Sequence, residues 1–129
     1  MAGSETQRIS AVAPDELAEA PGYPGVVRET AFAAERAVLV RARAEAGTAT
    51  GWHHHGDRDV FGYLVRGRAR LEFGPGGGES TDIEERGFFH VPAGLVHRDV
   101  NPFDEPQEFV LAFVGSGPLA VDVDGPEPG

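Results

Sequence analysis

The 129-residue sequence contains no cysteine and no lysine. The absence of cysteine excludes disulfides, thiolate metal ligands and cysteine nucleophiles, and the absence of lysine excludes Schiff-base chemistry. No run of about eighteen apolar residues is present, so we predict no membrane-spanning helix. The first residues, Met1 to Thr6, lack the positive start and apolar stretch of a secretory signal. We therefore expect a cytoplasmic protein.

All eleven cationic residues are arginine, and the formal net charge is -10 at pH 7. A protein that binds nucleic acid needs a basic face to neutralise phosphates, and an acidic chain is repelled by anionic membranes. We therefore expect neither a nucleic-acid nor a membrane partner. A small molecule or another protein remains, and the 40% content of hydrophobic residues is ordinary for a globular domain.

Turn signals recur roughly every six to twelve residues through most of the chain, which is typical of a sandwich or barrel of short strands. The sequence therefore predicts an all-β fold, a single antiparallel β-barrel or jelly roll, over residues 23–123. We expect residues 1–22, which mix small residues with prolines, and residues 124–129 to be flexible tails.

Alternation is clearest over residues 37–45, where valine and alanine alternate with leucine, arginine and glutamate. The alanine content would also suit a helix, but arginines spaced by two favour a strand. Residues 60–66 and 68–73 read as strands joined by a tight reversal at Gly67. Further strands are expected at 81–84, 88–91, 96–100, 108–114 and 119–123.

The five histidines are grouped as His53-His54-His55, His90 and His97. Imidazole is a common ligand for divalent transition metals, and its neutral form is available near pH 7. On a strand, residues two apart share a face, so His53 and His55 project together while His54 points away. Asp59 has the same parity and is a candidate oxygen ligand. His97 would join them from a distant strand.

These residues resemble the two motifs of the cupin family. Gly47, His53, His55, Asp59 and Gly67 are spaced as in the first motif, and Pro92 to His97 followed by Asn101 resembles the second. The resemblance extends from about residue 23 to 123. It implies a cupin barrel that binds one metal ion through His53, His55, Asp59 and His97.

The first motif departs from the family pattern at the carboxylate position, where an aspartate replaces the usual glutamate. The spacing to Gly67 also allows Val60 to occupy this position, which would leave a site of three histidines. The ligand set suits one divalent ion of Fe, Ni, Mn, Zn, Co or Cu per chain, with open coordination positions for a substrate.

The site favours a metal-dependent enzyme acting on a small organic molecule, first of all an oxidoreductase of the dioxygenase type. A redox-neutral isomerase or lyase, a non-catalytic sensor that binds a small ligand, and a structural interaction protein are the alternatives. His90 and Tyr63 are the candidate catalytic residues, His90 as a base and Tyr63 as a hydrogen-bond donor. Both are equally suited to structural roles.

The resemblance also implies a homodimer, because single-domain cupins commonly pair through strands near the N-terminus. The alternating segment 26–46 is the expected contact.

Overall fold

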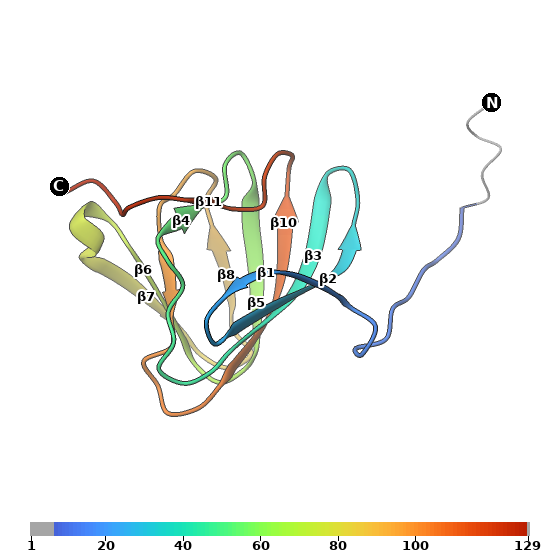
Figure 1. Cartoon of the computed structure of the whole chain (residues 1–129), viewed down its shortest axis with the longest axis horizontal. Coiled ribbons are helices and arrows are strands. Elements are labelled where there is room, and N and C mark those ends of the chain that lie inside the picture. Colours follow the sequence, from blue (N-terminus) through green and yellow to red (C-terminus); the bar gives the residue numbers. More distant parts are fainter. Residues whose placement is uncertain (1–6, 129) are drawn as a thin grey trace.

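The computed structural model describes residues 7–128 and consists mainly of β-strands joined by turns (Figure 1). The strands are β1 (Ala18–Tyr23), β2 (Val26–Ala33), β3 (Ala37–Ala44), β4 (His53–His54), β5 (Asp59–Arg66), β6 (Ala69–Phe73), β7 (Glu79–Ile83), β8 (Phe88–Val91), β9 (Arg98–Val100), β10 (Gln107–Val114) and β11 (Val121–Asp122). A 3-10 helix, η2 (Pro75–Gly77), lies in the turn between β6 and β7. The predicted all-β class is confirmed.

One layer is a six-stranded antiparallel sheet in the order β1-β2-β3-β10-β5-β8. Within it, β3 shows the alternation predicted from the sequence: Val38, Val40 and Ala42 are buried, whereas Leu39 and Arg41 are not. On one side β10 pairs along the whole of β3, and on the other side β2 pairs with it from Val38 to Ala44. The strand therefore forms in spite of its alanine content, because its valines and alanines bury one face.

The second layer combines the three-stranded sheet β7-β6-β9 with the two-stranded sheet β11-β4. Isolated bridges from His53 to His97 and from Ala49 to Val100 connect these two sheets. The apolar core fills the space between the layers and includes Leu64 and Phe113, both almost fully buried. In Figure 1, β4 and β11 lie at one end of the molecule, and β6 and β7 lie to one side.

The two layers form a jelly roll instead of a closed barrel. Strands β7 and β8 each end a sheet, and within residues 7–128 they do not pair with each other. A cavity of about 840 Å³ lies beside them, with Ile83 of β7 and Phe89 of β8 among its lining residues.

The sheet begins earlier than the sequence predicted. The boundary expected at residue 23 is corrected because β1 starts at Ala18 and pairs antiparallel with β2, with Ala18 opposite Thr30. Residues 18–22, expected in a tail, are therefore part of the fold. Their mixed composition hid the strand, because β1 lies at a sheet edge and has no buried residue.

The predicted tight reversal at Gly67 is also corrected. Strands β5 and β6 lie in different layers and do not pair with each other, so Gly67 makes a corner between the sheets. Its φ of 88° favours glycine, and a Cβ atom there would collide with the carbonyl oxygen of Pro106. Both a corner between sheets and a tight hairpin turn favour glycine, so the sequence alone could not distinguish the two.

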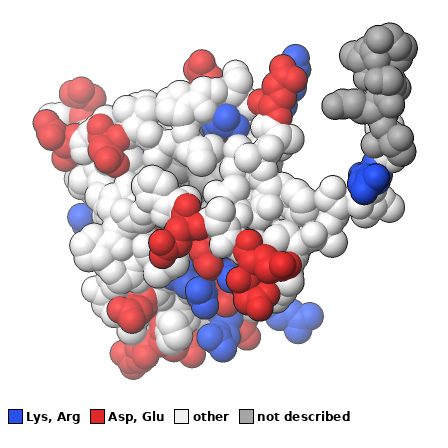
Figure 2. All heavy atoms as spheres, turned by 45° about the vertical axis from the view of Figure 1, so that its right-hand side comes forward, with Lys and Arg blue, Asp and Glu red and all other residues white. Residues whose placement is uncertain are grey.

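Acidic side chains are scattered over the face drawn in Figure 2, and basic side chains gather among acidic ones at its lower end. This mixture agrees with the surface ion pairs of Arg41 with Glu29 and Arg70 with Asp82. Within residues 7–128, the structure has no helix with the length and apolar character needed to cross a membrane.

Candidate metal centre

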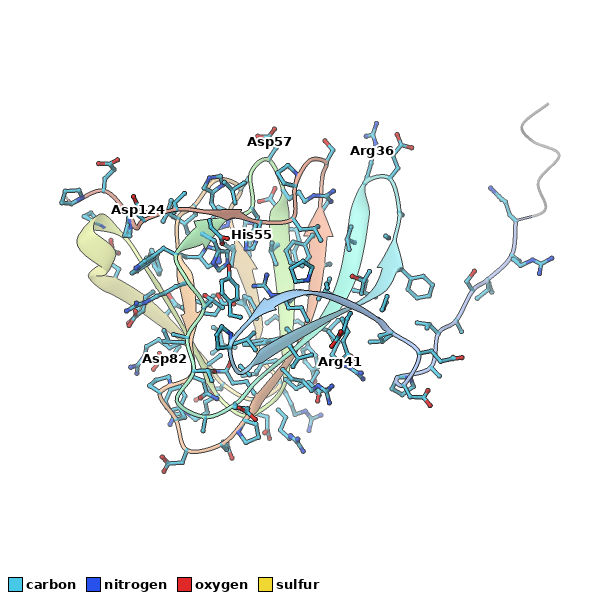
Figure 3. The ribbon with its side chains drawn as sticks, viewed as in Figure 1. Arg36, Arg41, His55, Asp57, Asp82 and Asp124 are labelled. Carbon is cyan, nitrogen blue, oxygen red and sulfur yellow. The ribbon has the colours of Figure 1, made fainter. Side chains whose placement is uncertain are left out.

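Two segments far apart in the sequence bring three histidines together. His53 opens β4 and His97 directly precedes β9. The backbone N–H of each donates to the carbonyl oxygen of the other, with both N–O distances 2.9 Å. His55 follows on the same side as His53, and Figure 3 shows it inside the molecule next to β4 and β11. His54 is turned away, and its Nδ1 accepts a hydrogen bond from Gly56 N.

One ring nitrogen of each histidine is bound to the backbone. The Nδ1 atoms of His53, His55 and His97 lie 2.8, 2.7 and 2.9 Å from the carbonyl oxygens of Gly51, Leu119 and Leu95, in that order. A carbonyl oxygen only accepts, so each Nδ1 carries the proton and donates it. In the neutral rings the lone pair therefore lies on Nε2.

The three Nε2 atoms converge. The ligand atoms of His53, His55 and His97 all lie within 4.8 Å of one another, and Nε2 of His55 is 3.3 Å from Nε2 of His97. Nε2 of His53 is buried and has no hydrogen-bond partner within residues 7–128. Three acceptor nitrogens facing one another in a dry interior are unfavourable unless a cation joins them.

All three histidines of the cluster are buried, with exposed fractions of 0%, 4% and 2% for His53, His55 and His97. Burial lowers the pKa of His53, and it lowers the pKa of His55 to about 4. Neutral imidazole is the form that binds metals. His53 and His55 are therefore in the form that can bind a metal at neutral pH.

The residues present fit a divalent transition ion. Their donors are nitrogens alone, which suit Zn, Cu, Fe, Co or Ni, and each ring is oriented by a backbone carbonyl behind it, as is usual for metal-bound histidine. Three protein ligands leave open positions, which distinguishes a catalytic site from a closed structural one.

Asp59, the expected fourth ligand, does not lie with the histidines. Along β5, Val60 and Leu64 are buried, so Asp59 belongs to the outer face of the sheet. Its Oδ1 accepts hydrogen bonds from Nε2 of His90 at 2.8 Å and from Ala93 N at 3.3 Å. The hydrogen bond from His90 lowers the pKa of the Asp59 carboxyl. Val60, which the spacing to Gly67 also allowed at the carboxylate position, is the residue that points inward, and the cluster contains the three histidines without Asp59.

The candidate catalytic residues His90 and Tyr63 share the outer face with Asp59. His90 stacks on Phe61, with ring centroids 4.6 Å apart and an interplanar angle of 11°. Tyr63 packs against Phe88 at 4.8 Å, and Phe88 is 80% exposed. The alternation of residues along the strands correctly placed Asp59 and Tyr63 on one face of β5, but it did not show which face of the sheet is buried. Neither residue is placed to act at the histidine cluster.

Two residues near the cluster were missed by the sequence analysis. Asp99 Oδ1 lies 3.7 Å from Nε2 of His97. Tyr23 lies with its ring centroid 6.0 Å from that of His53, and its hydroxyl donates to Asp122 Oδ1 at 2.9 Å. Burial and this hydrogen bond raise the pKa of Tyr23 to about 12. The sequence could have indicated Asp99, because it follows His97 by two residues and would share a face with it on a strand. Tyr23 gave no such indication, because it lies at the predicted boundary between the tail and the fold.

A cavity of about 330 Å³ is lined by residues that neighbour the cluster, and its lining includes Tyr23, Arg28, Phe113, Leu119 and Asp122. Leu119 and Phe113 both contact His55, Leu119 through its carbonyl oxygen and Phe113 through its ring. None of the three histidines is itself a lining residue of this cavity or of the larger one beside β7 and β8. The smaller cavity is the candidate substrate chamber because Tyr23, Phe113 and Leu119, which line it, lie against His53 or His55.

The structure is a jelly roll with a buried cluster of three histidines that could hold a metal ion. The family described as the cupin domain matches residues 40–113, which cover more than half of the chain and include all three histidines. The chain therefore belongs to the cupin family. No curated protein matches the sequence.

Solved structures support the fold. The polyketide cyclase RemF from Streptomyces resistomycificus matches with a TM-score of 0.74 and 18% identity, over 90% of this chain and 86% of that one. An RmlC-like cupin from Shewanella frigidimarina matches with a TM-score of 0.69 and 16% identity, over 85% and 94%. Oxalate decarboxylase from Bacillus subtilis matches with a TM-score of 0.67 and 21% identity, over 77% of this chain and 28% of that one.

Proposed function

We propose that this cupin is a metal-dependent enzyme that acts on a small organic molecule. The observation that carries the proposal is the convergence of three Nε2 lone pairs from His53, His55 and His97 beside a cavity of about 330 Å³. One divalent transition ion per chain would be held by these three nitrogens. When bound, it would supply a Lewis acid and, if redox-active, a centre for oxidation.

The chain's own groups divide the remaining work. Backbone carbonyls behind each Nδ1 hold the three rings in one orientation. The phenol of Tyr23 stays protonated at neutral pH and donates to Asp122 at the chamber wall. Asp99 lies 3.7 Å from Nε2 of His97 and is the carboxylate that could exchange a proton next to the metal-binding nitrogens. Phe113 and Leu119 give the chamber an apolar lining that limits access by water.

The first reaction class to test is a dioxygenase-type oxidation, because a site with three histidine ligands leaves open positions for both a substrate and O₂. A redox-neutral reaction is the second candidate, favoured by Asp99 and by the Tyr23–Asp122 pair. These groups could move protons without a change of redox state. The cupin fold supports both kinds of chemistry, so the fold does not choose between them.

The decisive experiment combines elemental analysis with substrate screening. Protein purified without added metal is expected to contain about one transition ion per chain, and His53→Ala and His97→Ala are expected to lose it. Unchanged metal content in both variants would overturn the proposal. The metal-loaded protein is then screened for O₂ uptake and for product formation without O₂ against diketones, flavonols, thiols and hydroxy acids. Ligand binding without turnover of any of these would instead indicate a sensor.

We also propose a homodimer formed through the outer face of the six-stranded sheet. The exposed large hydrophobic residues on this sheet are Val27, Phe32, Leu39, Phe61, Val65, Phe88 and Val114. Large apolar patches on a surface commonly mark protein contacts. The expected contact segment 26–46 supplies β2 and β3 of the same sheet.

A further inference from the structure

A buried arginine lines the candidate substrate chamber. Arg28 of β2 is only 8% exposed, and it is the one arginine among the lining residues of the 330 Å³ cavity. Its guanidinium carbon lies 5.4 Å from the ring centroid of Tyr23, the ring that also neighbours His53. Arg28 and the histidine cluster therefore flank the same aromatic side chain.

The guanidinium of Arg28 has no ion-pair partner among residues 7–128. Its Nε is buried without a hydrogen-bond acceptor in the described part of the chain. An arginine is always protonated in a protein, and a buried charge is normally paired. An anion from outside the chain would supply the missing acceptor for the buried Nε and would neutralise the charge.

Arg58 shows what a structural buried arginine looks like in this protein. It is 7% exposed, and its guanidinium donates to the carbonyl oxygens of Phe113, Gly115 and Gly117. Arg58 thereby ties the end of β10 to the loop that precedes β5. Arg28 makes no comparable set of bonds, although it is equally buried.

Two acidic groups near Arg28 limit the charge of the anion. Asp99 borders a small inner cavity of about 10 Å³ together with Arg28, and Asp122 lines the substrate chamber. Both would repel a dianion such as a phosphate monoester more strongly than a monoanion. A guanidinium fork matches the two oxygens of a carboxylate. A single carboxylate group is therefore the best match in charge and shape.

We infer that Arg28 is a substrate-binding residue that pairs with the carboxylate of a small organic acid, whose other polar end faces the three histidines. This inference rests on the proposed function, because it names the substrate class of the same site. A chamber of about 330 Å³ suits a molecule with few atoms.

Calorimetric binding of salicylate and of its neutral counterpart salicylamide to the metal-loaded full-length protein tests the inference. Salicylate is expected to bind about tenfold more tightly or better. Arg28→Gln should weaken salicylate binding by about tenfold or more and change salicylamide binding by less than about twofold. Arg28→Lys should retain part of the salicylate preference. Arg43→Gln removes the same charge from the outer side of β3 and should leave both affinities unchanged.

A stability measurement separates a binding role from a structural one. Because Arg28 forms no ion pair within residues 7–128, Arg28→Met should leave the melting temperature unchanged or raise it, whereas Arg58→Met should lower it strongly. An equal fall in both variants would show that Arg28 has an internal partner and would overturn the inference.

Three other results would also overturn it. These are equal affinities for salicylate and salicylamide, an unchanged salicylate affinity in Arg28→Gln, and tighter binding of phenyl phosphate than of salicylate. Metal content is measured on the same samples. If the unmodified protein binds no metal, the proposed function is contradicted, whereas the role of Arg28 is not.

Discussion

His53 and His97 exchange both of their backbone hydrogen bonds, each with an N–O distance of 2.9 Å. This bridge joins β4 to the segment before β9 and sets the distance between two histidine rings without help from a ligand. The rings are further held by carbonyl oxygens at Nδ1. The site is therefore preorganised by the backbone, and metal binding needs little rearrangement of the chain.

The position of Asp59 predicts that metal binding does not depend on it. Asp59→Ala should leave the metal content and the metal affinity unchanged within about twofold, because its carboxylate is hydrogen-bonded to His90 on the outer face. Elemental analysis and competition with a chelator measure this, with His53→Ala as the positive control. Loss of metal in Asp59→Ala would restore the four-ligand interpretation.

The buried histidines predict that the metal-free protein loses stability in weak acid. An unfolded histidine has a pKa near 6.5, whereas that of His55 in the folded protein is about 4. Between these values the unfolded chain binds a proton that the folded chain does not, so the free energy of unfolding falls as pH falls from 6.5 towards 4. His55 alone should account for about 3 kcal/mol of this loss.

Urea denaturation of the metal-free protein at a series of pH values measures this slope. His55→Gln removes the group and should flatten part of the dependence. A pH-independent free energy of unfolding between pH 6.5 and 4 would contradict the burial of the neutral ring.

Asn101 should be important for stability and not for metal binding. Its amide is 1% exposed, donates to the carbonyl oxygens of Ala44, Glu45 and Glu105, and accepts from Phe103 N. Asn101→Ala should lower the free energy of unfolding by about 2–4 kcal/mol, because buried backbone carbonyls lose their donor. Chemical denaturation measures the change, with Ser80→Ala on the exposed strand β7 as the control. The metal content of the folded variant should be unchanged.

The exposed apolar face of the six-stranded sheet predicts a dimer that a charge can dissociate. Phe61→Asp and Phe88→Asp should each shift the protein from dimer to monomer, because a carboxylate would be buried unpaired in the contact. Sedimentation velocity measures the state, and Thr81→Asp on β7 controls for added charge. A monomeric unmodified protein at micromolar concentration would contradict the dimer.

Most of the strands and the pairing of His53 with His55 on one face were predictable, because both depend on local periodicity. Alternation identified β3, and the spacing of two placed His53 and His55 on one side. The structural role of Asn101 was not visible in its own segment. It became clear only when Ala44, Glu45 and Glu105 were brought around the amide.

Strand periodicity did not predict which face of β5 points into the core, and for this reason Asp59 and Tyr63 were expected near the histidines. Asp59, Phe61 and Tyr63 alternate with Val60, Gly62 and Leu64, and neither set is polar enough to mark the surface. The inward face is decided by the partner strand β8, whose Phe89 ring covers Gly62 and leaves no space for a side chain there. Alternation therefore showed which residues share a face of β5, but only packing against β8 determined which face is buried.

The sequence by itself therefore determined the all-β class and the three histidines of the candidate metal centre, because strand periodicity and imidazole chemistry are properties of short segments. Only the tertiary structure decided that Asp59 lies outside the cluster and that Asp99 and Tyr23 lie next to it. It also placed Arg28 in the chamber wall, where its Nε has no acceptor among the described residues. These relations depend on contacts between distant strands, which local patterns do not encode.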